Sequence, residues 1–93
     1  MSQLAPLPDL EMRLKTLLVE RLKLEVAVDD IDSTTPLFGP EGLGLDSIDA
    51  LELVLGVEQD FKVSIEDEEV GTEALESVRT LAHFVRTREQ ASA

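Results

Sequence analysis

Apolar residues recur every three or four positions in several stretches of the chain, a spacing typical of amphipathic helices. The first stretch comprises Leu10, Leu14, Leu17, Leu18 and Leu22. It predicts a helix over 9–23, with Asp9 as the N-cap residue. Two prolines precede this helix and predict an extended N-terminal arm over 1–8.

A second helix is predicted over 47–61. Apolar residues cover most of its circumference, so we expect most of this helix to be buried. One stripe stays polar and comprises Asp49, Glu52, Gly56 and Gln59 or Asp60. Because glycine destabilises a helix interior relative to alanine, Gly56 indicates either close packing at that position or tolerance of movement.

Two further helices are predicted toward the C-terminus. The first is short, spans 66–70 and ends at Gly71. The last helix is capped by Ser77 and fades by Arg88, and the tail over 89–93 is expected to fray. No stretch alternates with a period of two, so no sheet is expected.

The connection over 24–45 is rich in proline and glycine, which prevents a long regular element there. Its apolar residues nevertheless indicate an ordered loop that packs on the core. The predicted fold class is therefore all-α, a small four-helix bundle of three main helices and one short helix with a long ordered first loop. Its domain is expected to span 9–88.

The charge balance narrows the function further. The chain has 93 residues, with 8 Lys and Arg against 20 Asp and Glu, and a net charge of −12. This charge argues against binding to nucleic acid or to anionic membranes and favours basic partner surfaces. The length allows one domain and argues against a large internal cavity. The absence of cysteine excludes disulfides, thiolate zinc sites and a cysteine nucleophile. Because no membrane-spanning apolar run and no basic leader are evident, we expect a cytoplasmic protein, and a chain of this charge repels its own copies, so a monomer is expected.

No pattern of catalytic residues stands out. A serine triad needs a histidine as the base, and His83, in the last predicted helix, is the only histidine. Carboxylate pairs are numerous but are expected by chance in so acidic a chain. A non-catalytic protein is therefore predicted.

A calcium loop is a weak alternative. Asp30, Asp32, Thr34 and Glu41 imitate the spacing of EF-hand ligands. However, Thr35 stands where that loop requires glycine. A capped turn is the preferred interpretation, and no intrinsic metal is expected.

The most informative segment is Gly42-Leu43-Gly44-Leu45-Asp46-Ser47-Ile48-Asp49. It delivers a serine to the start of the second helix. Asp46 and Ser47 are both preferred N-cap residues, so one of them is redundant as a cap. A helix N-terminus also favours a phosphate, which a modified Ser47 would bring.

This segment, together with Leu51-Glu52-Leu53, Glu58, Phe61, Ile65 and the acids over 67–69, resembles the acyl carrier proteins over residues 10–87. The resemblance implies that a phosphopantetheinyl transferase, using magnesium and coenzyme A, attaches 4′-phosphopantetheine to the Ser47 hydroxyl. The terminal thiol of this arm then carries acyl groups as thioesters, which a chain without cysteine cannot do itself. Fatty-acid, lipid or polyketide-type synthesis is implied.

The same resemblance implies a recognition surface on the second helix for synthases, transferases and reductases with basic docking surfaces. The residues that it assigns to the attachment and recognition region are Asp46, Ile48, Asp49, Glu52, Leu55, Glu58 and Asp60. The acyl chain is expected between the helices, where the small residues Ala50 and Gly56 leave room. An aminoacyl carrier and an unmodified interaction module with the carrier fold remain alternatives.

The chain departs from the family pattern in two places. Ile48 stands where leucine is most common, and the stretch over 66–77 is slightly longer than usual. The segment over 38–44 is similar to specialised carriers rather than to the housekeeping fatty-acid carrier.

Overall fold

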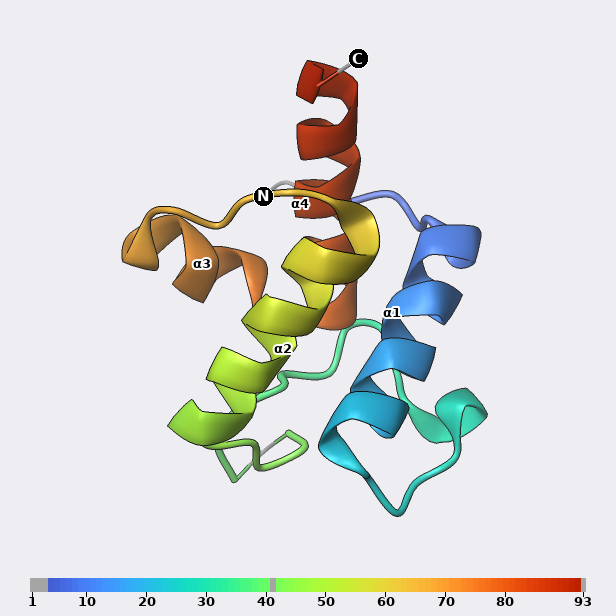
Figure 1. The fold of residues 1–93 in the computed structure, drawn as a ribbon. Helices are drawn as coiled ribbons and strands as arrows, with labels where there is room; N and C mark the ends of the chain where they lie inside the picture. Colours follow the sequence, from blue (N-terminus) through green and yellow to red (C-terminus); the bar gives the residue numbers. More distant parts are fainter. Residues whose placement is uncertain (1–3, 41, 93) are drawn as a thin grey trace.

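The computed structural model describes residues 4–40 and 42–92. Within them the chain forms α1 (Pro8–Leu22), a 3₁₀ turn (Val28–Asp30), α2 (Ser47–Phe61), α3 (Glu68–Ala74) and α4 (Val78–Ser92). No strand occurs in this part of the chain, so the predicted all-α four-helix bundle is confirmed. Figure 1 shows α2 crossing in front of α4, with α1 on one flank and α3 on the other.

A single apolar core joins α1, α2, α4 and the first loop. Its largest fully buried side chains are Leu14, Leu18, Leu37, Leu53, Val57, Val78, Leu81 and Val85. Helix α1 contacts both α2 and α4, whereas the short α3 packs against α4. None of the described helices is long and apolar enough to cross a membrane.

Helix α1 begins one residue earlier than predicted, and Asp9 is not its cap. Pro8 occupies the first helical position, where its missing N–H costs nothing. Leu7 is the N-cap residue, and its backbone N–H donates to the Glu11 carboxylate at 2.8 Å. The Glu11 side chain therefore accepts a hydrogen bond from a backbone N–H at the start of α1, which is the role that the sequence predicted for Asp9.

Helix α3 differs most from its prediction. Asp67 caps it by accepting from the Glu69 and Val70 amides, and the helix continues to Ala74. Gly71 therefore lies in the middle of α3 and does not end it. Tertiary contact overrides the usual tendency of glycine to terminate a helix.

Helix α4 begins as predicted, because the Ser77 hydroxyl accepts from the Thr80 amide at 3.2 Å. It continues to Ser92, beyond the predicted end near Arg88. Most of the predicted tail over 89–93 is therefore helical. Ala93, like residues 1–3 of the predicted arm, lies outside the described residues.

The first loop is ordered, as predicted, because the core and the start of α4 hold it. Leu37 is fully buried, and its amide donates to the Glu76 carbonyl at 3.0 Å. A parallel bridge joins Phe38 and Leu45. This bridge brings the loop beside the start of α2, so it positions both Phe38 and the segment that leads into Ser47.

Candidate functional site at the start of helix α2

Asp46 alone caps α2. Its carboxylate oxygen Oδ1 accepts from the Ile48 amide at 3.0 Å and the Asp49 amide at 2.9 Å. The Asp49 carboxylate returns to the Asp46 amide at 3.1 Å, which completes a capping box. The predicted redundancy of the two caps is thus resolved in favour of Asp46.

Because Asp46 is the N-cap residue, the Ser47 side chain does not cap α2. It is exposed at the first position of α2, and its hydroxyl has no hydrogen-bond partner among the described residues. The Asp46 carboxylate accepts from the Ile48 and Asp49 amides, so these two amides are not free to bind a phosphate at the helix start. A phosphate site on Ser47 stays a prediction.

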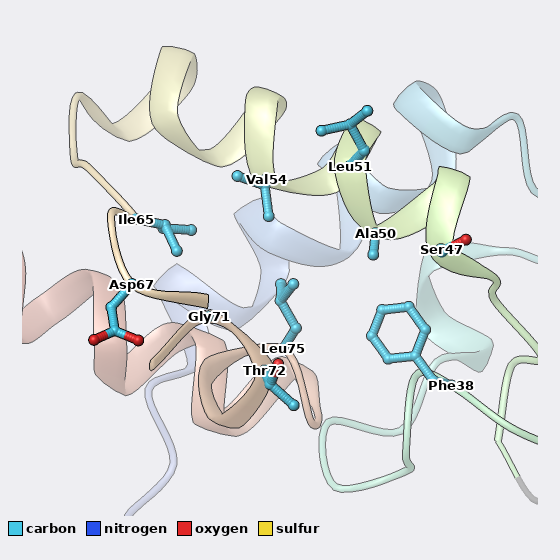
Figure 2. A pocket seen from close by; sticks show the side chains of 10 residues that line it. All are labelled: Phe38, Ser47, Ala50, Leu51, Val54, Ile65, Asp67, Gly71, Thr72 and Leu75. Atoms are coloured by element: carbon cyan, nitrogen blue, oxygen red, sulfur yellow. The ribbon is translucent and has the colours of Figure 1, made fainter. Parts of the chain in front are cut away.

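A pocket of about 530 Å³ opens beside Ser47. Figure 2 shows it as a trough between α2 and α3, with Ser47 and Phe38 at one end and Ile65 and Asp67 at the other. The α2 wall consists of Ser47, Ala50, Leu51 and Val54, and the α3 side consists of Gly71, Thr72 and Leu75. Most of this lining is apolar. The pocket is an open trough and not an enclosed cavity.

Ala50 and Gly56, the two small residues predicted to leave room for an acyl chain, lie in two different places. Ala50 lines the pocket. Gly56 is buried but faces α1, where an added Cβ atom would lie 2.9 Å from Arg21 Cδ and 3.2 Å from Leu17 Cδ2. Gly56 therefore allows α1 and α2 to pack closely, as predicted, and contributes nothing to the pocket.

The solvent face of α2 is apolar, contrary to the expectation that most of this helix is buried. Ile48 is 72% exposed, Leu51 61% and Leu55 41%. These residues recur at three-four spacing, so they form one stripe that begins next to Ser47. Periodicity alone cannot distinguish such a stripe from a face that packs on the core, which is why the sequence reading missed Leu51.

The predicted recognition acids differ in their surroundings. Asp46 and Asp60 are exposed. Glu58 is half-buried, and its carboxylate accepts from the Ile65 amide at 2.8 Å, which fixes the connection between α2 and α3. One carboxylate oxygen of the half-buried Glu52 is shielded and has no hydrogen-bond partner among the described residues. A role of these acids in recognition stays a prediction.

The other candidate residues lie away from Ser47. His83 is on α4, and its Nε2 atom is 2.6 Å from the Ala5 carbonyl oxygen, a contact that holds the N-terminal arm. Asp32 accepts from the amide and the hydroxyl of Thr34, which is the predicted capped turn. Glu41, the last residue of the calcium hypothesis, is outside the described residues. Among the rest, no group of three or more potential metal-ligating side chains converges.

The family comparison agrees with this geometry. The family model of the phosphopantetheine attachment site matches residues 13–85. The chain belongs to this family. It is therefore a carrier protein with covalently attached 4′-phosphopantetheine, as the resemblance implied. An exposed serine hydroxyl with no hydrogen-bond partner in the described part of the chain fits the attachment of such an arm.

Membership in the family also defines the general kind of partner. A carrier domain interacts with a phosphopantetheinyl transferase, which modifies it, and with synthase enzymes, which use its cargo. Carrier domains of this family are generally non-catalytic.

Proposed function

We propose that this chain is an acyl carrier protein that bears its 4′-phosphopantetheine on Ser47. The observation that supports this assignment is the exposed Ser47 hydroxyl at the end of a largely apolar pocket, which has no hydrogen-bond partner among the described residues because Asp46 performs the capping. The bound arm supplies a thiol that holds cargo as a thioester. The chain itself orients the attachment point and shelters the cargo.

Attachment makes one bond and breaks one. The Ser47 oxygen forms a phosphodiester bond with the pantetheine phosphate of coenzyme A, and adenosine 3′,5′-bisphosphate leaves. The hydroxyl proton is lost to the transferase, which also supplies the magnesium. The chain contributes an accessible nucleophile on a rigid helix start.

The pocket favours an acyl cargo over an aminoacyl cargo. Its walls are mainly the side chains of Phe38, Ala50, Leu51, Val54 and Ile65. An aliphatic chain gains free energy from burial against such walls. An ammonium group finds only one charged lining residue, Asp67, at the end opposite Ser47, and is unfavourable against the rest of the lining. Fatty-acid, lipid and polyketide-type synthesis all use cargo of this kind, and we place the chain in the cytoplasm.

The partners we propose combine an apolar hollow with a basic rim. The apolar hollow of the partner accommodates Ile48, Leu51 and Leu55 of α2. The basic rim of the partner faces the acidic residues around these three side chains. The segment 24–61 contains no Lys or Arg, so no positive charge of that segment opposes these acids. Such charges raise the rate at which the carrier and an enzyme associate more than they raise the affinity of the complex. This suits a carrier that must leave each enzyme.

The rate of transferase modification tests this docking surface. We expect Leu51→Asp to lower kcat/KM for modification, because a carboxylate in the apolar hollow is left desolvated and unpaired. Met12→Asp is the matched control, since Met12 is 46% exposed on α1, outside the α2 stripe. It should be modified at the wild-type rate. Equal rates for both variants would contradict docking through α2.

A further inference from the structure

Gly71 occupies an unusual position for a glycine. It is the central residue of the seven-residue helix α3, it is buried, and it lines the pocket. Glycine lowers the stability of a helix interior relative to alanine. A helix this short depends on tertiary packing for its stability. The glycine therefore requires a compensating reason.

The two conformational reasons for a glycine, a positive φ and the end of a helix, do not apply to Gly71. The described glycines with positive φ are Gly39 and Gly44, so Gly71 does not need the left-handed region. The C-cap residue of α3 is Leu75, so Gly71 does not end the helix. The remaining reason is space at the position of the side chain.

The space beside Gly71 belongs to the pocket and to Ile65. A Cβ atom at residue 71 would lie 3.0 Å from Ile65 Cγ2, closer than ordinary van der Waals contact. Both residues line the pocket, and Figure 2 shows Ile65 at the end farthest from Ser47. A methyl group at residue 71 must therefore displace Ile65 or occupy pocket volume.

We propose that Gly71, opposite Ile65, determines how long an apolar chain the pocket accepts. This inference rests on the proposed function, because the occupant is the acyl chain carried on Ser47. The glycine leaves room for about the volume of one methyl group at the distal end. Gly71 is thus a residue that determines cargo length and makes no contact with the thioester.

The effect is measurable as protection of the thioester. Each methylene group that leaves water favours the sheltered state by about fourfold. A methyl group at residue 71 displaces about one methylene of a chain that fills the pocket. We therefore expect Gly71→Ala to reduce the protection of such a chain by about fourfold, with no effect on a short chain.

The experiment uses the full chain loaded with butyryl-, octanoyl- or palmitoyl-pantetheine from the corresponding coenzyme A thioesters. The rate of thioester cleavage by hydroxylamine is measured for each form by intact mass. Gly56→Ala is the matched control, because Gly56 is the other glycine within the described helices and faces α1 rather than the pocket. Ile65→Val acts in the opposite sense, since it removes a methyl group from the pocket wall.

The proposal predicts faster cleavage of the longer chains in Gly71→Ala, slower cleavage in Ile65→Val, and wild-type chain-length dependence in Gly56→Ala. Far-UV circular dichroism of each variant confirms that it is folded. Identical chain-length dependence in wild type, Gly71→Ala and Ile65→Val would overturn the role of Gly71. That result is distinct from failure of the proposed function, in which the wild-type chain takes up no acyl-pantetheine at all.

Discussion

Replacing Glu11 with glutamine tests the contact that joins the start of α1 to α4. Glu11 is 5% exposed, and its Oε2 atom accepts from the Leu7 amide at 2.8 Å and from Arg79 Nε at 3.3 Å. The Arg79 amide in turn donates to the Ser33 carbonyl at 2.9 Å. One carboxylate thus connects the N-terminal helix, the first loop and the last helix.

The magnitude follows from the charge of the acceptor. Hydrogen bonds to a charged group contribute about 1.5–3 kcal/mol, against about 0.5–1.5 kcal/mol between neutral groups. Glutamine keeps the shape and one acceptor but loses the charge. We therefore expect Glu11→Gln to lower the free energy of unfolding by about 1–2 kcal/mol at neutral pH.

The same substitution has a defined pH dependence. Burial acts to raise the pKa of Glu11, but the Leu7 amide, the Ser33 hydroxyl and the Arg79 guanidinium outweigh it, so the pKa lies below its ordinary value of 4.5. The stabilising contribution is therefore complete above pH 4.5. It is lost as the pH falls through the lowered pKa, because the Glu11 carboxylate is then protonated in the folded protein as well as in the unfolded chain.

Urea unfolding followed by far-UV circular dichroism, at neutral and at acidic pH, measures this effect. Glu20→Gln is the matched control, because Glu20 is exposed on the same helix and changes the net charge equally. It should alter the free energy of unfolding by less than about 0.5 kcal/mol. A Glu11→Gln deficit that persists unchanged at acidic pH would refute the argument, because the loss would then come from packing and not from charge.

Three further substitutions test local features of the fold, each by the same unfolding measurement. Asp46→Ala should cost about 1 kcal/mol, since it removes the α2 cap, whereas Asp46→Asn should stay near wild type; equal losses would contradict the capping role. Lys62 ends α2 at a φ of 56°, so Lys62→Gly should stabilise the protein by about 1 kcal/mol, and a loss would contradict strain at that residue. Gly42→Ala should destabilise it by about 2 kcal/mol or more, because the added Cβ atom would overlap the Pro36 carbonyl oxygen; a neutral result would show that the loop rearranges freely.

The helices with strong periodicity and local caps were predictable from the sequence. The start of α2 and of α4 follows from side-chain caps at Asp46 and Ser77, which act within a few residues. The start of α1 was misplaced because Glu11 replaces the expected cap from four residues downstream. The hydrogen bond from the Leu7 amide to the Glu11 carboxylate can be recognised only when the backbone of the first helical turn is known.

Features that depend on contacts distant in the sequence were not predictable. Gly71 was taken as a helix end because nothing local shows that it lines a pocket. The exposed stripe of Ile48, Leu51 and Leu55 was partly mistaken for core, because a partner surface and a core face have the same periodicity. The motif predicts Ser47 as the attachment site, but only the structure shows that its hydroxyl has no hydrogen-bond partner among the described residues.

The most direct test of the account is the intact mass of the chain before and after incubation with a promiscuous phosphopantetheinyl transferase, magnesium and coenzyme A. We predict a gain of one phosphopantetheinyl unit in the wild type and in Ser64→Ala, which removes an exposed serine of the α2–α3 connection. We predict no gain in Ser47→Ala. A gain that survives Ser47→Ala, or no gain in initially unmodified wild-type protein with several transferases, would contradict attachment at Ser47.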